Sequence, residues 1–203
     1  MSGISVEIYE AFRLLKAKDL AGAEAALQRG LAHCTSPAEE ALVISSQGVL
    51  AKSKGDFREA WKCYEKAEKL LPDDPALKII LAKLLIERFA QYDTAIKKLK
   101  SVLKLAKGSP SFEHQAHAAM AVAYLRKGEK KKSIEMMERA IGENFDKIRS
   151  AKNINLEVVE AFLARNFEVE RCRTYLTKAL TLAQLRREDK SVAFLTKLLA
   201  SLP

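Results

Sequence analysis

The feature that most constrains the fold is a stretch of 34 residues, from Ala41 to Asp74, with the pattern of two helices joined by a tight turn. Small and apolar residues recur at helical spacing in both halves: Ile44, Gly48 and Ala51, then Ala60, Tyr64 and Ala67. Gly55 and Asp56 predict the turn, because glycine commonly ends a helix and aspartate caps the next one. Pro72 then ends the second helix, which proline cannot continue.

Three helix starts, one of them just before this stretch, indicate that the arrangement is repeated. Each is a capping residue followed by proline, which fits the first turn of a helix: Ser36-Pro37, Asp74-Pro75 and Ser109-Pro110. The prolines at 37, 75 and 110 lie 38 and 35 residues apart, a period typical of helical repeat proteins. The sequence therefore predicts successive helix pairs.

The composition favours an ordered, all-helical chain. Hydrophobic residues make up 48% of the 203 residues, which is enough to bury a core, so the chain is not disordered by composition. Only 7% of the residues are aromatic. Alanine and leucine dominate instead, as helix packing prefers. Strand-like alternation is hard to find.

The stretch from Ala41 to Asp74 resembles the tetratricopeptide repeat. That family has a small residue at the place of Gly48, a Gly-Asp-aromatic turn at Gly55, Asp56 and Phe57, and a proline at the place of Pro72. It also has alanines at the places of Ala60 and Ala67 and an aromatic residue at the place of Tyr64, while Ile44 replaces its usual aromatic residue in the first helix. The resemblance implies an all-α fold, a right-handed superhelix of antiparallel helix pairs with a C-terminal capping helix.

The register of this unit divides the whole chain, which we expect to form one domain over residues 1–203. Four copies are predicted at about 4–36, 37–74, 75–109 and 110–142, followed by a degenerate pair at 151–185 and a capping helix at 188–202. In the first copy, Lys18-Asp19-Leu20 replaces the Gly-Asp-Phe turn. An irregular link is expected over 143–152, where the pattern breaks.

The resemblance also implies a function, that of a non-catalytic scaffold or adaptor that binds a partner segment. In this family the first helix of each pair lines a concave groove where peptides bind. The register places these residues in the groove: Ile8, Tyr9, Phe12, Ser45, Ser46, Val49, Lys52, Ile79, Ile80, Lys83, Ala118, Ala119, Val122 and Arg126.

The residue types in this groove restrict the partner. The family's carboxylate clamp needs Lys, Asn and Arg at several groove positions, where this chain has isoleucine, serine and alanine, which argues against that mode. An apolar groove better suits an amphipathic or apolar protein segment. Lys52, Lys83 and Arg126 would favour acidic flanks on it. The alternatives are that the chain's own ends fill the groove, or that the protein self-associates into a homodimer through the groove or its terminal helix.

The basic residues suggest a different class of partner. Residues 1–75 carry a net charge of −2 and residues 76–203 a net charge of +11. The proposed basic face comprises Lys97, Lys98, Lys100, Lys130, Lys131, Lys132, Arg186 and Arg187. Such a face could bind nucleic acid or another anionic surface. No aromatic residues are interleaved with the lysines to stack on bases, so nucleic acid is the less favoured alternative.

The sequence offers no catalytic, cofactor or metal motif. There is no Gly-x-Ser-x-Gly, no phosphate-binding loop and no Cys-x-x-Cys. His114 and His117 could share a metal ion on one helix, but no third ligand is near in sequence. Three widely spaced cysteines, no signal-peptide pattern and no run of eighteen apolar residues lead us to expect a cytoplasmic protein without a membrane span.

Overall fold

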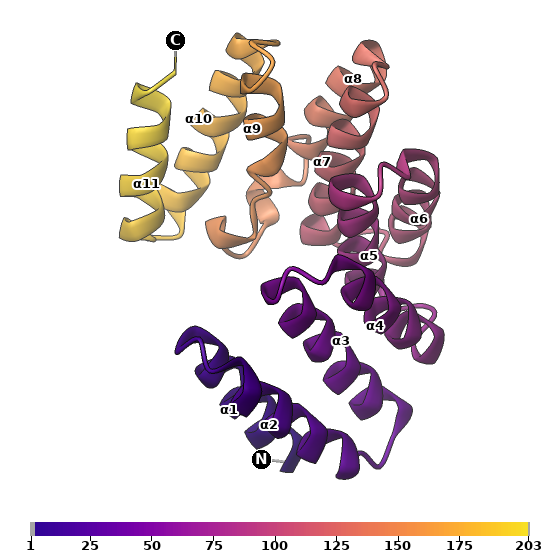
Figure 1. Cartoon of the computed structure of the whole chain (residues 1–203). Helices are drawn as coiled ribbons and strands as arrows, with labels where there is room; N and C mark the ends of the chain where they lie inside the picture. The colour runs from indigo at the N-terminus through magenta and orange to yellow at the C-terminus, as the bar shows by residue number, and fades with distance from the viewer. Residues whose placement is uncertain (1–2, 203) are drawn as a thin grey trace. The chain divides into compact units, whose positions relative to one another are not determined.

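The computed structural model describes residues 3–202, and every regular element in that range is helical (Figure 1). The eleven α-helices described are α1 (Gly3–Lys16), α2 (Leu20–Ala32), α3 (Pro37–Ser53), α4 (Phe57–Leu70), α5 (Pro75–Arg88), α6 (Tyr92–Leu105), α7 (Pro110–Arg126), α8 (Lys130–Ala140), α9 (Glu157–Leu163), α10 (Val169–Leu185) and α11 (Asp189–Ala200). Two short 3-10 helices, η1 (Phe145–Lys147) and η2 (Ala151–Asn153), lie between α8 and α9. The all-α helical repeat fold predicted from the sequence is confirmed.

The chain forms two compact units, and we describe each by itself. Unit 1 ends at Leu84 and unit 2 begins at Leu85, so α5 contributes to both. The predicted helix starts at Pro37, Pro75 and Pro110 are all confirmed. Among the described residues, no helix is both long enough and apolar enough to span a membrane.

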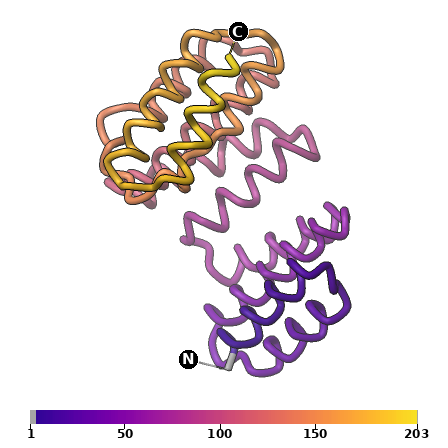
Figure 2. Tube along the Cα trace, turned by 90° about the vertical axis from the view of Figure 1, so that its left-hand side faces the viewer, coloured from indigo at the N-terminus to yellow at the C-terminus, as the bar shows by residue number. Residues whose placement is uncertain are grey.

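Unit 1 is built of helix pairs whose ends are fixed by capping. The helices of each pair, α1 with α2 and α3 with α4, pack side by side (Figures 1 and 2). Asp56 caps α4, accepting a hydrogen bond from the Glu59 backbone amide at 2.9 Å. Asp19 caps α2 in the same way through the Gly22 amide. The two turns are therefore equivalent, as the register predicts.

In the turns before α2, α4, α6 and α8, the residue before the N-cap position has a positive φ. In some of these turns this residue is glycine and in others it is not. Gly55 and Gly128 have φ values of +79° and +81°, which glycine adopts without cost. Lys18 and Ala90 take the same left-handed conformation without being glycine, at φ 63° and 52°. The missing glycines thus put two residues under mild backbone strain. The turn at Lys18 keeps the five-residue hydrogen bond of the Gly55 turn, from Asp19 to Leu14, whereas the turn at Ala90 is one residue longer, with a bond from Gln91 to Leu85.

The core of unit 1 is made of small and branched side chains between neighbouring helices. One cluster joins α1, α2 and α3 and includes Ile4, Ala26, Leu27 and Val43. A second contains Ala41, Ile44, Ala67 and Leu77, and so joins α3 and α4 to the start of α5. Each pair therefore buries its apolar face against the next, as a repeat array requires.

Unit 2 is organised around α7, which packs against α6, α8 and α9. All ten residues from Ala116 to Leu125 are buried except His117, which is half-buried. The irregular stretch predicted over 143–152 lies within the segment 141–156 between α8 and α9, which contains η1 and η2 and is called the link below. The next helix, α9, begins at Glu157, inside the range predicted for the degenerate pair. The helices α10 and α11 lie side by side (Figure 2), with Leu195 of α11 buried, in agreement with the predicted capping helix.

Candidate binding surfaces

The first helices of unit 1 present accessible apolar side chains at several predicted groove positions. On α1, Tyr9 is 73% exposed and Phe12 is 37% exposed, and Ile80 of α5 is 36% exposed. Between them in sequence, α3 contributes Val49, which is half-buried, and Lys52, which is exposed. Ile8, Ser45 and Lys83 are also half-buried. The exposed side chains among them, Tyr9, Phe12, Ile80 and Lys52, are accessible to a partner.

Two predicted groove residues of unit 1 are instead buried. Ser46 and Ile79 are 5% and 6% exposed. The Ser46 hydroxyl donates to the carbonyl of Leu42 within α3, so its hydrogen bond is internal. Ser46 also lines a small pocket with Phe12 of α1 and Leu50 of α3, where the two helices meet. The predicted accessibility of these two side chains was wrong, because neighbouring helices cover them.

In unit 2 the predicted groove residues of α7 are closed off. Ala118, Ala119 and Val122 are 0%, 2% and 6% exposed, so the expectation that they line an open groove was wrong. Gln115 lies on the same helix face, one turn before Ala119, and donates to the backbone carbonyl of Asn153 in the link. The link and α9 therefore cover the face of α7 that would otherwise be accessible.

Several side chains hold this link through its backbone. Lys178 of α10 donates to the Ile141 carbonyl at 2.8 Å. Arg186 donates to the carbonyls of Asp146 and Ile148 at 2.7 and 3.1 Å. An irregular segment has carbonyls that no regular ladder satisfies, and these long cationic side chains supply the missing donors. The sequence pattern alone did not identify this function of Lys178 and Arg186.

A buried polar network connects α7, the link and α10. Nδ1 of His114 lies 2.8 Å from the Ala140 carbonyl, and Nε2 accepts a hydrogen bond from the Asn155 amide at 2.8 Å. These partners assign the proton to Nδ1. The Tyr175 hydroxyl donates to the Asn155 carbonyl at 2.7 Å. Burial lowers the pKa of His114 to about 4, so the ring is neutral and its function is structural.

The remaining groove residue, Arg126, is also engaged within unit 2. Its guanidinium donates to the Ile86 carbonyl at 2.7 Å, in the last turn of α5. The adjacent Lys127 pairs with Asp93 and Glu129. These hydrogen bonds raise the pKa of Lys127, and those from Lys132 and Lys127 lower the pKa of Glu129 to about 2. Cations in this part of the chain thus stabilise the ends of helices.

The residues of the proposed basic face come from α6, the start of α8 and the end of α10. Lys130, Lys131 and Lys132 begin α8, whereas Arg186 and Arg187 follow the end of α10. The Lys130 ammonium lies 5.3 Å from the Phe167 ring centroid, beside the turn that precedes α10. Arg186 contacts the link at the other end of α10. The remaining members, Lys97, Lys98 and Lys100, lie on α6. Lys130 and Arg186 therefore lie near opposite ends of α10.

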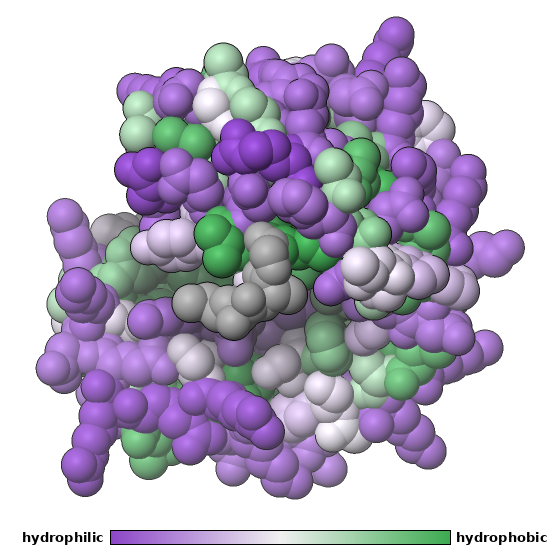
Figure 3. Space-filling view, turned by 90° about the horizontal axis from the view of Figure 1, so that it is seen from below, coloured by the Kyte–Doolittle hydropathy of each residue, from purple (hydrophilic) through white to green (hydrophobic). Residues whose placement is uncertain are grey.

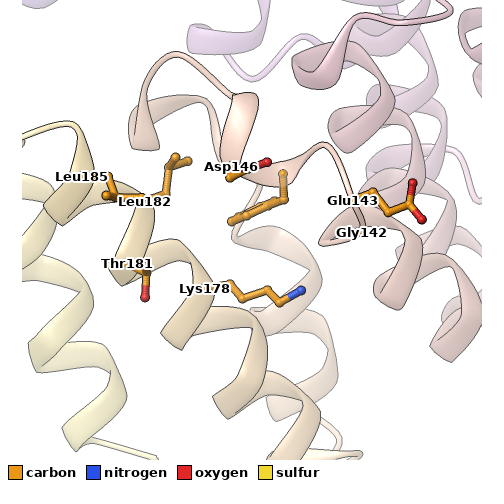
Figure 4. Close-up of a pocket in the computed structure, with 8 residues that line it drawn as sticks. Gly142, Glu143, Asp146, Lys178, Thr181, Leu182 and Leu185 are labelled. Atoms are coloured by element: carbon orange, nitrogen blue, oxygen red, sulfur yellow. The ribbon is translucent and has the colours of Figure 1, made fainter.

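A pocket in unit 2 was not anticipated from the sequence. It has a volume of about 580 Å³ and lies between the start of the link and α10 (Figure 4). Its lining residues are Gly142, Glu143, Phe145, Asp146, Lys178, Thr181, Leu182 and Leu185. Leu185 is 65% exposed. Figure 3 shows one face of the molecule, on which hydrophilic side chains predominate and apolar ones lie between them. Accessible apolar side chains thus occur on the first-helix face of unit 1 and at this pocket, and also singly at Leu42, Leu105 and Phe194.

The chemistry of the side chains gives no support for a reactive site. Among the described residues, no group of three or more His, Cys, Asp or Glu side chains is arranged to hold a metal ion. Burial raises the pKa of Cys63, and it raises that of Cys172 to about 11, so both thiols stay protonated at neutral pH. Both cysteines act here as small apolar residues.

Comparison with known families matches part of the chain to one sequence family. Residues 114–147 match the family described as tetratricopeptide repeat. In that register Ala121 and Gly128 take the places that Gly48 and Gly55 have in the stretch 41–74. A comparison with curated protein sequences gave no match.

Solved structures with the same fold support the match. MamA from Desulfovibrio magneticus RS-1, residues 41 to the end, is 19% identical, with a TM-score of 0.59, covering 92% of this chain and 98% of that one. PilF of Pseudomonas aeruginosa is 14% identical with a TM-score of 0.63, covering 97% and 90%. TPR-like repeats of a putative kinesin light chain from Podosopora anserina are 16% identical with a TM-score of 0.63, covering 92% and 98%.

At these identities the structural likeness shows the fold. Helical repeats of this kind generally bind other proteins through extended surfaces and are generally not catalytic. The matched repeat, the helix pairs of both units and the shared fold lead to one conclusion. Residues 114–147 match a tetratricopeptide repeat, and the chain as a whole has the all-α helical repeat fold of the tetratricopeptide repeat proteins to which it is similar.

Proposed function

We propose that this protein is a non-catalytic adaptor that binds an apolar or amphipathic protein segment on the first-helix face of unit 1. The observation that supports the proposal most directly is the exposure of Tyr9, Phe12 and Ile80 on α1 and α5. Large apolar side chains cost free energy when left in water, about 25 cal/mol for each Å² that a partner would bury. A partner covering these side chains would recover that free energy.

The charges on this face indicate the flanks of the partner. Lys52 of α3 is exposed and Lys83 of α5 is half-buried, beside Val49 and Ile80. Acidic residues on either side of the apolar segment would complement these ammonium groups and speed association. The proposed partner is therefore an apolar or amphipathic segment flanked by Asp or Glu, bound without chemical change.

The test is a peptide-display selection against the full chain, followed by affinity measurements on the enriched peptides. In one variant, Phe12→Arg and Ile80→Arg place two charges on the proposed surface. The matched control, Phe194→Arg with Leu105→Arg, makes similar changes at exposed positions of α11 and α6. We expect the first variant to weaken binding at least tenfold and the control to change it less than twofold.

Circular dichroism would verify that both variants keep the helical content of the wild type. If the enriched peptides bind the folded Phe12→Arg/Ile80→Arg variant as well as the wild type, the unit 1 face is not their site.

A further inference from the structure

A row of exposed lysines runs along α6. Lys97, Lys100 and Lys104 are exposed and lie three and four residues apart, so they share one side of the helix. On its other side α6 buries Leu99 and Val102, and it packs against α7. We call Lys97, Lys100 and Lys104 the α6 lysine row. The row follows the helix for about 10 Å, at a rise of about 1.5 Å per residue.

The equivalent helix of the preceding repeat, α4, pairs its lysines with acids. The Lys62 ammonium lies 3.3 Å from the Glu59 carboxylate. One turn further along, the Lys69 ammonium lies 3.6 Å from the Glu65 carboxylate. The lysines of α4 therefore have an opposite charge beside them on their own helix.

Both of these acids are absent from α6. When α4 and α6 are aligned from their first residues, Thr94 replaces the first acid and Lys100 replaces the second. Lys97 and Lys104 stand where α4 also has lysine. The row thus keeps the two lysines of α4, adds a third between them and lacks the acids that would balance them.

The charge of the row is not compensated within the protein. In the part of the chain that the structure describes, none of its three lysines makes an ion pair. The single acidic residue of α6, Asp93, is bonded to the Lys127 ammonium at 2.6 Å. Lys100 and Lys104 are like charges four residues apart, which repel one another on a helix. The helix dipole favours a cation at Lys104, in the last turn, but not at Lys97.

From these observations we infer that the α6 lysine row binds an acidic helix of a partner protein, whose Asp or Glu side chains repeat at the same spacing of three and four residues. Two helices that lie side by side have the same rise per residue, so each carboxylate faces one ammonium. The partner's charge also relieves the repulsion within the row.

The composition of α6 favours carboxylates over nucleic acid as the bound groups. The helix has no arginine to bind phosphate through two hydrogen bonds, and none of its exposed residues is an aromatic that could stack on a base. The row belongs to unit 2 and uses charge alone. It is therefore independent of the function proposed for the unit 1 face.

The test uses the full chain and two fluorescent, alanine-based helical peptides of about 20 residues. In the patterned peptide, glutamates repeat at the spacing of three and four along one side. In the scattered peptide, the same number of glutamates is spread around the helix. Fluorescence polarisation should show the patterned peptide binding at least fivefold more tightly. Its binding should weaken several-fold as NaCl rises from about 50 to about 200 mM.

Variants of α6 then locate the binding. Thr94→Glu with Lys100→Glu gives α6 the two acids of α4, and it should weaken binding of the patterned peptide at least tenfold. The matched control, Thr196→Glu with Lys197→Glu, makes the same two changes at exposed positions of α11 and should change binding less than twofold. Lys100→Arg keeps the charge and should also stay within about twofold. Circular dichroism would verify that each variant keeps its helical content.

Three results would overturn the inference: no binding of the patterned peptide, equal binding of the two peptides, or equal binding by the α6 variant and its control. A fourth is an oligonucleotide of the same charge that binds more tightly than the patterned peptide and loses this binding in the Thr94→Glu/Lys100→Glu variant. That result would assign the row to nucleic acid.

Discussion

Gly48 of α3 lies against the ring of Tyr64 in α4 so closely that a Cβ atom added at Gly48 would be 2.7 Å from Cε1 of the tyrosine. Tyr64 is 1% exposed, so its ring is enclosed by the neighbouring side chains. The glycine is therefore required by the approach of the two helices. Their separation sets the geometry of the α3–α4 pair on which the accessible side chains Val49 and Lys52 depend.

The Gly48→Ala variant should lower the free energy of unfolding of the protein. Alanine gains about 1 kcal/mol in helix propensity, but the overlap with Tyr64 should cost about 1–3 kcal/mol and exceed that gain. Gly30→Ala in α2 is the matched control, because its nearest neighbour would be 3.4 Å away. Urea denaturation should show Gly30→Ala at least as stable as the wild type. Equal stabilities for the two variants would contradict the packing argument.

Capping at the start of α6 offers a stabilising change. Gln91 precedes this helix at φ −88° and ψ 62°, and its side chain makes no capping hydrogen bond. Asp56 stands at the same place before α4, at φ −85° and ψ 83°, and does cap. Gln91→Asp should therefore raise the free energy of unfolding by about 0.5–1 kcal/mol, and Asp56→Ala should lower it by about 1 kcal/mol. Thermal melts of both variants would check this. A destabilised Gln91→Asp variant would show that the turn before α6 does not allow the capping geometry of the turn before α4.

The neutral, buried His114 should make stability depend on pH in a defined window. Its pKa is lowered by burial from 6.5 to about 4, so between these values the unfolded chain binds more protons than the folded one. The free energy of unfolding should therefore fall as pH falls from 6.5 towards 4, by up to about 3 kcal/mol. Burial also lowers the pKa of His117, so its protonation should lower the free energy of unfolding further as pH falls.

Urea denaturation at pH 7.0 and pH 5.0 measures this effect. The lowered pKa values of carboxyl groups such as Glu10, Glu39 and Glu188 cost stability only as pH falls below about 4.5, so they contribute little at pH 5.0. His114→Gln cannot titrate and should show a smaller difference between the two pH values. Direct titration of His114 by NMR that gave a pKa near 6.5 would contradict the burial argument.

Periodicity and capping chemistry predicted most of the helices. Pro37, Pro75 and Pro110 begin helices as expected, because a cap followed by proline is a local signal. The predicted equivalence of Lys18 and Gly55 was also confirmed, since both are left-handed. Signals of this kind depend on residues that are neighbours along the chain, which is why the sequence is sufficient for them.

The candidate sites were less predictable because they depend on contacts between distant residues. The hydrogen bond from the Asn155 amide to His114 joins residues 41 apart, and that from Arg186 to Ile148 joins residues 38 apart. An irregular link has no period that would show where it lies. The sequence therefore did not reveal that the link covers α7, or that a pocket forms beside α10.

The open and the covered first-helix faces can be compared directly at equivalent positions. Ser45 of α3 and Ala118 of α7 have the same place in the repeat register, yet Ser45 is half-buried and Ala118 is fully buried. Ala118→Arg should place a charge in that buried space and lower the free energy of unfolding by about 3 kcal/mol or more. Ser45→Arg can direct its guanidinium into water and should change it by less than about 1 kcal/mol.

Denaturant unfolding of the two variants, with hydrogen exchange at 148–156, would make the comparison. In Ala118→Arg we expect faster exchange in the link, because the arginine must displace it to reach water. In Ser45→Arg the link should exchange as in the wild type. If Ala118→Arg is as stable as the wild type and the link stays protected, the face of α7 is not closed by the link, and it would join the accessible binding surface of the protein.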